Sequence, residues 1–466
     1  MQTTSTPPST ERAVWGSKLA FIFAAAGSAI GLGNIWGFPT TAALNGGAAF
    51  LVIYLIAVAA IGAPVMLAEL AIGRRTKRNP VGAFSALAPK SAWVIVGALG
   101  VLAGLVILSF YSVIAGWSLA YILKTVTGTF TEGADTAAIF NDLAGSAPNA
   151  LFWHGVFMVI TVYVVLQGVK EGIERWTKVL MPVLFVILLL LIFRAVTLSG
   201  AGPGLDFYLR PDFSKVTGVT VLAAVGQAFF SLSLGMGAMI TYGSYLSRKD
   251  DLVSSSLLVT LADTTIAIMA GLIIFPTLFH ASMDPTQSGP GMVFVTLTSL
   301  LTEIPPQPYG GVIFGTMFFV LLAIAGLTSS VSLLEVTTAY FVDEKKISRK
   351  KASIWLGVAA FTLGVPSALA NGAVPWLSNL PGVGLDFLTF MFTVFGQYAL
   401  VIGALFISLF AGWVWGIKAV GEEVRANDGA FPLGRTWAFL IRFVCPVAIT
   451  ALFFQLIIPV VRGLLS

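Results

Sequence analysis

The sequence predicts an all-α polytopic membrane protein with eleven transmembrane helices, arranged as two five-helix repeats of inverted topology plus one further helix. Of the 466 residues, 57% are hydrophobic and only 10% are charged, which leaves too little polar surface for a soluble globule of this size. Several apolar runs exceed the roughly 20 residues that cross a bilayer. Two of these runs, five helices apart, are interrupted by glycine and polar residues.

The spanning helices are separated by loops rich in Pro, Gly and charged residues. The polar segment 1–11 precedes the first span and is expected to be a disordered cytoplasmic tail without a cleaved signal peptide. The spans are expected at 18–42, 48–72, 92–124, 150–167, 176–197, 218–247, 252–281, 309–342, 350–370, 384–412 and 434–462.

Lys and Arg are concentrated in alternate loops. Basic clusters occupy 74–78, 170–178, 248–249 and 345–351, whereas the loops 282–308 and 371–383 contain no Lys or Arg. Because basic loops stay in the cytoplasm, this pattern predicts a cytoplasmic N-terminus and an external C-terminus. The net charge of +5 is explained by this topology and by contact with the lipid bilayer, so no nucleic-acid partner is expected.

The two interrupted spans carry the strongest functional signal. Residues 27–39 and 229–237 place glycines and polar groups in the middle of apolar runs. Glycine costs about 1 kcal/mol relative to alanine in a helix, and a non-helical backbone at membrane depth persists where it lines a site. A repeat of five helices inverts its second copy, so we expect repeats at 12–197 and 198–412, with 413–466 outside them.

Five motifs, in order, make the chain resemble the neurotransmitter:sodium symporter family and especially its bacterial amino-acid transporters. They are Gly-Leu-Gly-Asn-Ile-Trp-Gly-Phe-Pro at 31–39, Asn-Gly-Gly-Ala-Ala-Phe at 45–50, Gly-Ile-Glu-Arg-Trp at 172–176, Ser-Leu-Ser-Leu-Gly-Met-Gly at 231–237 and Ala-Gly-Leu-Thr-Ser-Ser at 325–330. The resemblance covers nearly the whole chain from Arg12 and implies the leucine-transporter-type fold, with helices one and six broken.

The hydroxyls of Thr328 and Ser329 lie beside the carbonyl of Ala325, and sodium prefers a cage of oxygens. Alternatively, these hydroxyls bond back to their own helix. The resemblance implies a sodium site here, completed by the carbonyls of Gly27 and Ile30. It implies a separate sodium site formed by Ala29, Asn34, Ser231 and an oxygen from helix seven. The substrate's carboxylate would complete the coordination of this ion.

Asp263 is a carboxylate inside the apolar run 257–278, where a charge is expensive and usually functional or paired. Counting from Ser231 places it at an asparagine of the family, in the sodium site of helix seven. A fixed negative charge there balances sodium, a task that bound chloride partly performs in animal members, so we expect chloride-independent transport. The alternative is a protonated, hydrogen-bonded aspartate.

The amides of Leu32 and Gly33 begin the half-helix after the first break, where an anion is favoured. The resemblance places a substrate carboxylate there, bound also by Tyr111, and places an ammonium group near the carbonyls of Ala29, Phe230 and Ser231 and the Ser233 hydroxyl. Gly31 stands where monoamine carriers have an aspartate, which favours an α-amino acid. The side-chain pocket would be formed by Ser28, Ile107, Phe230, Met236, Ser329 and Leu333.

Because this pocket is mostly apolar and uncharged, we expect neutral, bulky aliphatic or aromatic L-amino acids. Met236 stands where the leucine transporter has phenylalanine, and its flexible thioether yields to large groups; as mere apolar filler it would say nothing of size. A carrier of a small osmolyte or ω-amino acid, or a transport-silent amino-acid sensor, remains an alternative.

The resemblance also assigns gates. The inner gate would comprise Arg12, Trp15, Ser244, Tyr245 and Asp343, although the two charges could equally be solvated helix ends. In the outer gate Asp386 is retained, but Gly37 replaces the usual arginine, so Asp386 needs another partner or Phe230 and Tyr111 close that side. The Gly172 and Pro182 pair resembles a family element that unwinds in helix five, or more plainly belongs to a helix start.

Enzymatic activity is not expected. Only two histidines occur, His154 and His280, and the sequence lacks HExxH, Gly-x-Ser-x-Gly and phosphate-loop motifs. Cys445 is the only cysteine, which excludes an intramolecular disulfide. With the resemblance, the sequence indicates a carrier in the bacterial inner membrane, with two sodium ions and no chloride; its oligomeric state is left open.

Overall fold

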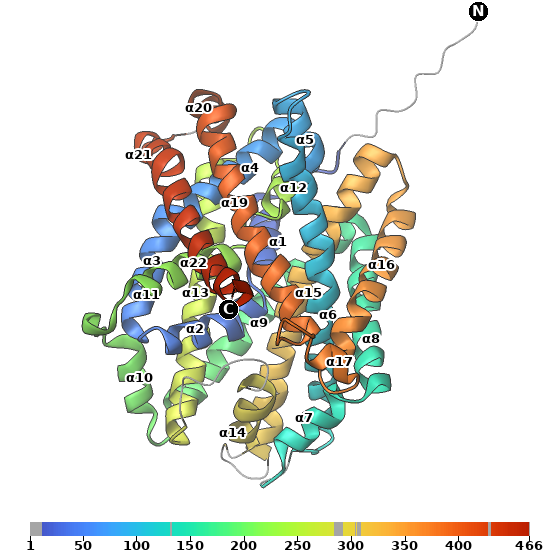
Figure 1. The fold of residues 1–466 in the computed structure, drawn as a ribbon, viewed down its shortest axis with the longest axis vertical. Helices are drawn as coiled ribbons and strands as arrows, with labels where there is room; N and C mark the ends of the chain where they lie inside the picture. The colour runs from blue at the N-terminus through green and yellow to red at the C-terminus, as the bar shows by residue number, and fades with distance from the viewer. Residues whose placement is uncertain are drawn as a thin grey trace, which may run out of the picture.

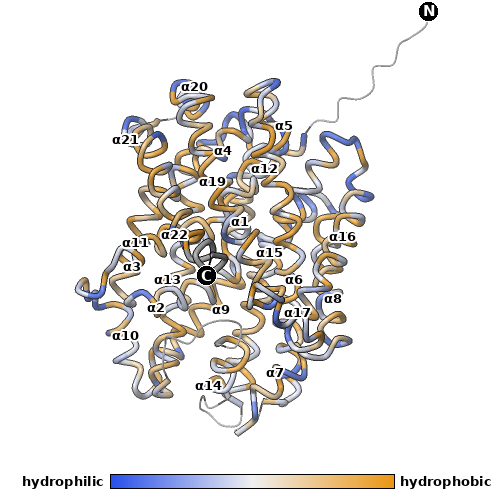
Figure 2. Tube along the Cα trace, in the orientation of Figure 1, coloured by the Kyte–Doolittle hydropathy of each residue, from blue (hydrophilic) through white to orange (hydrophobic). Residues whose placement is uncertain are grey.

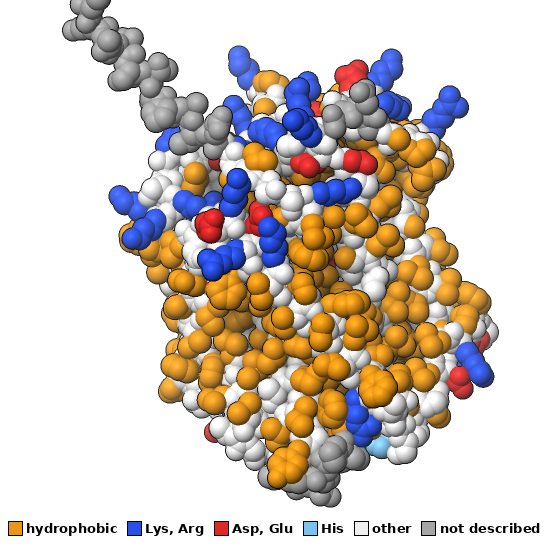
Figure 3. Space-filling model, turned by 180° about the vertical axis from the view of Figure 1, so that it is seen from behind, with side chains coloured by type: hydrophobic (Ala, Val, Ile, Leu, Met, Phe, Trp, Pro, Cys, Tyr) orange, Lys and Arg blue, Asp and Glu red, His pale blue; other side chains and the backbone are white. Residues whose placement is uncertain are grey.

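The computed structural model describes residues 12–130, 133–283, 292–302, 304, 309–426 and 430–465, and these form helices joined by turns and loops. Within these residues, nine helical segments are long and apolar enough to cross a membrane, and one bent pair, α1 with η1 and α2, makes a tenth. The remaining predicted span, 218–247, contains the shorter helices α11 (Gly218–Ser231) and α12 (Ala238–Gly243). Apolar side chains cover the middle of the molecule, whereas Lys and Arg gather at the end that carries α5 and α20 (Figures 1, 2 and 3).

The observed helix bounds follow the predicted spans closely. After the first broken span, five long segments are single helices: α6 (Val94–Val126), α8 (Ala147–Leu166), α13 (Leu252–His280), α15 (Tyr309–Lys345) and α16 (Arg349–Leu369). Two more consist of two helices joined by a π-helical turn: α3 (Ala48–Ala57), η2 (Val58–Gly62) and α4 (Ala63–Thr76), and α21 (Gly434–Phe439), η8 (Leu440–Val444) and α22 (Cys445–Leu465). In the last two, η3 (Val169–Glu174) precedes α9 (Arg175–Val196), and α18 (Phe387–Met391), η6 (Phe392–Ala399), α19 (Leu400–Leu409) and η7 (Phe410–Val414) follow one another.

The first span is broken as predicted. Helix α1 (Lys18–Ala29) starts at Ser17, whose side chain accepts a hydrogen bond from the Ala20 amide, and ends where Ile30 turns to an extended conformation. A π-helical turn, η1 (Gly33–Gly37), then leads into α2 (Phe38–Leu44), and the two halves are bent by 56°. Because residues 30–32 interrupt the regular helix, the Ile30 carbonyl and the amides of Gly31 and Leu32 bond to side chains instead of to the helix backbone.

The sixth span is broken in the same way. Helix α11 (Gly218–Ser231) begins with a capping box formed by Thr217 and Thr220, and α12 (Ala238–Gly243) resumes after six residues. Within the break, Ser233, Gly235 and Gly237 have φ values of 53°, 87° and 77°. A left-handed backbone is easy for glycine and strained for serine, so this segment cannot continue the helix.

The two breaks lie at the centre of the molecule, between α6, α13 and α15 (Figure 1). Helix α15 packs along α6 and also contacts α1, while α13 contacts both α1 and η1. The 5+5 division at 12–197 and 198–412 stays a prediction. The segment after 412 packs against the first half, because Arg74 at the end of α4 and Glu423 in α20 (Ile417–Val424) form a buried ion pair with Nε and Oε1 2.7 Å apart.

Short helices in the loops were not predicted from the sequence. They are α5 (Pro80–Leu87), α7 (Thr136–Ala144), α10 (Ala201–Leu209), η4 (Phe213–Lys215), α14 (Thr298–Thr302, after the π-helical η5, Met292–Leu297) and α17 (Pro375–Ser378). These segments are too short to show helical periodicity, and their capping residues also occur in ordinary turns. The predicted tail, residues 1–11, lies outside the described part of the chain.

Candidate functional site

A cavity of about 510 Å³ lies where the two breaks meet. Its inner part is lined by both broken spans, α6 and α15, and its far part by α18, η6, α19 and α22. Of the twelve residues predicted to bind substrate, only Ser231 does not line it; the other eleven are Ser28, Ala29, Leu32, Gly33, Ile107, Tyr111, Phe230, Ser233, Met236, Ser329 and Leu333. The structure therefore brings together residues from four separate parts of the sequence.

The amide-rich end of this cavity is formed by the first break and Tyr111. The Leu32 amide donates a hydrogen bond to the Tyr111 hydroxyl at 2.8 Å, so two of the three predicted carboxylate donors lie next to each other. Gly31 lies against the same hydroxyl: a Cβ on Gly31 would be 2.6 Å from Tyr111 Oη and 2.7 Å from Ser329 Oγ. No side chain fits at residue 31 without displacing these groups.

A cluster of serine hydroxyls and carbonyls lies on the other side of the break. Ser329 Oγ donates to the carbonyls of Ser28 and Ile30, both at 3.2 Å, and Ser233 Oγ donates to the Ser28 carbonyl at 3.1 Å. The Ser329 hydroxyl therefore bonds to the broken helix, whereas the alternative interpretation expected a bond to its own helix. These oxygens come from three spans that are distant in sequence.

Thr328 behaves differently from Ser329. Its hydroxyl donates to the carbonyls of Ile324 and Ala325 at 3.1 and 3.2 Å, which is the alternative considered for both residues. Thr328 nevertheless faces the break, because a Cβ on Gly27 would lie 3.2 Å from the Thr328 Cβ. The atoms of Thr328 closest to that position are Cβ and the Cγ2 methyl, at 3.2 and 3.5 Å.

Asp263 is fully buried and sits in a closed network with Asn34 and Ser231. Ser231 Oγ donates to Asp263 Oδ2 at 2.6 Å, and Asn34 Nδ2 donates to Oδ1 at 2.7 Å. Asn34 Oδ1 accepts from the Gly31 amide at 3.1 Å. Within the described residues Asp263 forms no ion pair. A buried carboxylate of this kind needs a cation or a proton for charge balance.

The sequence analysis missed two buried polar residues that bond to the breaks, Glu69 and Gln227. Glu69 is fully buried in α4, and its Oε1 accepts the Gly235 amide at 2.8 Å, so it holds the second break. Glu69 could have been recognised from the sequence, because it is the only charged residue in the apolar run 48–73. Gln227 donates from Nε2 to the Gly33 carbonyl at 3.3 Å and accepts from Thr41 at 3.3 Å, which ties the two outer half-helices.

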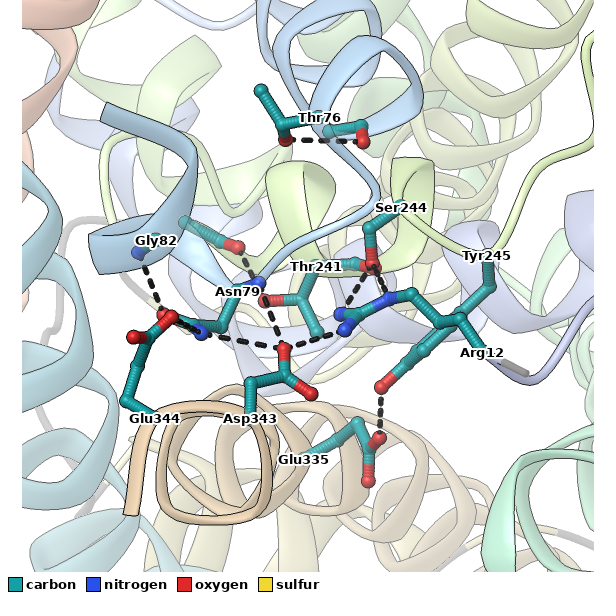
Figure 4. Close-up of polar contacts among 12 residues, drawn as sticks. Arg12, Thr76, Asn79, Gly82, Thr241, Ser244, Tyr245, Glu335, Asp343 and Glu344 are labelled. Atoms are coloured by element: carbon teal, nitrogen blue, oxygen red, sulfur yellow. Dashed lines mark hydrogen bonds and ion pairs between the residues drawn. The ribbon is translucent and has the colours of Figure 1, made fainter. Parts of the chain in front are cut away.

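The predicted inner-gate residues converge at the end of the molecule that is rich in Lys and Arg (Figures 3 and 4). Arg12 Nη1 lies 2.5 Å from Asp343 Oδ2, and its Nε and Nη2 donate to Ser244 Oγ at 2.9 and 2.7 Å. The Trp15 indole donates to the Tyr242 carbonyl at 3.1 Å, and the Tyr245 hydroxyl donates to Glu335 at 2.6 Å. None of these residues lines the cavity at the two breaks.

Asn79, which no sequence motif identified, supports the gate (Figure 4). It is buried at the start of α5, and its backbone amide and Nδ2 donate to Asp343 Oδ2 at 3.0 and 3.2 Å. Its Nδ2 also donates to Glu344 at 2.9 Å. Asp343 is thus held by α5 in the position where Arg12 meets it.

On the opposite side of the cavity, Asp386 bonds to a partner other than an arginine, which was one of the two alternatives predicted from the sequence. It caps α18: Oδ1 accepts from the Thr389 amide at 2.9 Å and Oδ2 from the Thr389 hydroxyl at 2.6 Å. Gly37 lines the cavity, and a Cβ there would approach only Phe230 Cε1, at 3.8 Å. The cavity reaches Leu388 and Thr389 past Phe230, so this side is not closed by an ion pair.

Comparison with known proteins agrees with this architecture. The sequence profile of the Sodium:neurotransmitter symporter family matches residues 12–141 and 146–463. The uncharacterized sodium-dependent transporter YhdH of Bacillus subtilis is 39% identical over 455 residues, covering 95% of this chain and 97% of that protein. The sodium- and chloride-dependent glycine transporter 2 of Xenopus laevis is 26% identical over 520 residues, covering 94% and 63%.

Among solved structures, that of MhsT in complex with L-phenylalanine superposes with a TM-score of 0.87. The two sequences are 43% identical, and the match covers 96% of this chain and 100% of the other. The fold class predicted from the breaks and spans is thereby confirmed.

Proposed function

Because this chain belongs to the sodium:neurotransmitter symporter family, we propose that it is a sodium-coupled symporter that imports neutral, hydrophobic L-amino acids by alternating access. The family consists of sodium-dependent transporters and not enzymes, and the chain is a multi-pass membrane protein. The observation that carries the proposal is the cavity at the two breaks, which combines amides for a carboxylate, carbonyls for cations and an apolar wall.

We propose that one sodium ion binds between Ser329, Thr328 and the carbonyls of Gly27, Ile30 and Ala325. Ser329 Oγ lies 3.2 Å from the Ile30 carbonyl oxygen, which supports this assignment. Sodium would take the place of the hydroxyl protons that now bridge these oxygens, because a bare cation needs several oxygens at once.

A second sodium ion would bind near Ala29, Asn34, Ser231 and Asp263, where the substrate's carboxylate completes its shell. The uncompensated carboxylate of Asp263 supports a cation at this place, and it makes a bound chloride unnecessary. To coordinate sodium, Asn34 would turn its amide oxygen from the Gly31 amide toward the ion. Substrate and sodium are then coupled through one shared carboxylate.

The apolar part of the cavity supports a hydrophobic side chain. Ile107, Phe230, Met236 and Leu333 line it, and no charged residue does. Gly31 leaves no room for an acidic side chain that would hold the amine of a biogenic amine. MhsT, whose solved complex contains L-phenylalanine, has the same fold at 43% identity, which supports a large amino acid.

Competition experiments test the substrate class. In proteoliposomes with a sodium gradient, we expect unlabelled tryptophan and phenylalanine to compete with labelled leucine, and alanine and glycine to compete poorly. Leucine buries three more carbon atoms than alanine, at about 0.8 kcal/mol each, so roughly fiftyfold weaker competition is expected from alanine. Preference for glycine, alanine or an ω-amino acid would contradict the proposal. Binding without any sodium-dependent uptake would instead indicate a sensor.

We propose that the cluster around Arg12 is the cytoplasmic gate of a carrier in the bacterial inner membrane, with the N-terminus in the cytoplasm. The concentration of Lys and Arg at this end supports the orientation (Figure 3). In the present state this gate is closed while the cavity extends toward α18. Alternating access then requires Arg12 to separate from Asp343.

Removing the gate arginine tests this assignment. Arg12→Ala deletes charge-assisted hydrogen bonds to Asp343 and Ser244, each worth about 1.5–3 kcal/mol, so we expect hydrogen exchange at the amides of 238–246 to become at least roughly tenfold faster. Exchange is measured by mass spectrometry at saturating sodium. Arg210→Ala is the control, because it breaks the exposed Arg210 to Asp206 pair in α10. Equal exchange in both variants would show that the Arg12 pair does not close the gate.

A further inference from the structure

Beside the proposed inner gate lies a second concavity of about 420 Å³, here called the gate cleft. Its charged lining consists of five basic side chains, Arg12, Lys77, Arg78, Lys346 and Arg349, and two acidic ones, Asp343 and Glu344. These residues come from four segments: the chain before α1, the turn after α4, the end of α15 and the start of α16. Because these charges come from separate segments and line one concavity, they differ from a row of solvated lysines along a single helix.

Two of the five cations are already neutralised. Arg12 is paired with Asp343 at 2.5 Å, and Arg349 is paired with Glu335, which lies behind the cleft wall. Glu344 accepts a hydrogen bond from Asn79 at 2.9 Å. In the part of the chain that the structure describes, no ion pair is formed by Lys77, Arg78 or Lys346.

Lys77 is partly buried in this lining. Its amine donates a hydrogen bond to the Leu246 carbonyl inside the protein, and it follows the end of α4. Burial, together with the nearby Arg74 guanidinium, lowers the pKa of Lys77, although Asp250 and Glu423 act in the opposite direction. A cation in such a place gains from an additional anion.

We propose that the gate cleft binds a phosphate group, supplied either by a phospholipid headgroup or by a free phosphate compound. Phosphate carries enough charge and enough acceptor oxygens to meet Lys77, Arg78 and Lys346 together, and both Lys and Arg are suited to it. The cleft also has apolar walls at Ala13, Ala339 and Val342, which accommodate the carbon skeleton of a phosphate ester.

A phosphate in this cleft stabilises the closed gate. The cleft joins the turn after α4, which carries Lys77 and Arg78, to the end of α15, where Lys346 follows soon after Asp343. Arg12, which must separate from Asp343 when the gate opens, lines the same cleft (Figure 4). A ligand that contacts both sides binds the closed state more tightly and shifts the population toward it. This consequence, unlike the site itself, rests on the gate assignment in the proposed function.

Direct binding to the purified full-length protein, in neutral detergent without sodium or amino acid, tests the site. One arm titrates inorganic pyrophosphate by calorimetry; the other counts retained phosphatidylglycerol against phosphatidylcholine by native mass spectrometry. We expect one equivalent of at least one probe, bound at least tenfold more weakly by Arg78→Gln combined with Lys346→Gln. Binding of phosphatidylglycerol alone identifies a lipid source, and binding of pyrophosphate identifies a free one.

The matched control is Arg248→Gln combined with Lys350→Gln, which removes two exposed charges from the same end of the molecule but outside the cleft. We expect it to change affinity less than twofold. No binding of either probe, or equal weakening in both double variants, overturns the proposal. Bound probe should also slow hydrogen exchange at 238–246 severalfold; unchanged exchange despite binding overturns the coupling to the gate. Because amino-acid uptake is not measured, failure here is distinguishable from failure of the proposed function.

Discussion

Asp263→Asn is expected to lower sodium-dependent amino-acid uptake about 100-fold, because roughly 3 kcal/mol is lost when one partner of a buried charge pair is removed. The asparagine keeps the shape of the side chain, and its oxygen still accepts from Asn34, while Ser231 can turn its hydroxyl to accept in place of donating. The change therefore removes chiefly the charge. Uptake of labelled leucine into proteoliposomes measures the effect.

The same assay tests chloride independence. For the unmodified protein we expect equal uptake when gluconate replaces chloride, because the fixed charge of Asp263 balances sodium within the site. Asp251→Asn is the matched control for Asp263→Asn. This exposed residue caps α13, and asparagine caps a helix equally well. Collapse of uptake in gluconate would refute chloride independence, and full activity of Asp263→Asn would refute the sodium role of this carboxylate.

Gly31→Ala is expected to abolish binding of both substrate and sodium. The added Cβ would lie 2.6 Å from Tyr111 Oη and 2.7 Å from Ser329 Oγ. Either hydroxyl can escape only by giving up its present bonds, to the Leu32 amide or to the Ser28 and Ile30 carbonyls. One methyl group thus disturbs the carboxylate site and a sodium site together, and we expect uptake to fall at least about 100-fold, corresponding to roughly 3 kcal/mol.

Thermal unfolding with and without leucine and sodium measures this loss directly. The unmodified protein should be stabilised most by both ligands together, whereas Gly31→Ala should unfold at the same temperature in all four conditions. Gly202→Ala provides the control, since a Cβ at residue 202 meets nothing within 4 Å. Ligand stabilisation that persists in Gly31→Ala would show that the break binds neither ligand at this point.

The sequence by itself determined the membrane spans and the position of both breaks. A spanning helix is recognised from the length of one continuous apolar run, and its end from the charge and proline that follow, which are local properties. The breaks are equally local, since clustered glycines at 31–37 and 235–237 oppose a helix wherever they occur. The family motifs then pointed to Asn34, Ser231 and Ser329 without any structure.

Only the tertiary structure decided which groups meet. Asn34 contacts Asp263 across 229 residues, and Asn79 contacts Asp343 across 264. Glu69 was visible as a lone acid, but its partner, the Gly235 amide, was not. Ser329 and Thr328 look alike in sequence, yet of the two only the Ser329 hydroxyl donates a hydrogen bond to the broken helix. A pattern along the chain reports the environment of each residue, whereas hydrogen bonds and charge balance depend on how helices pack, and packing is set by the whole chain at once.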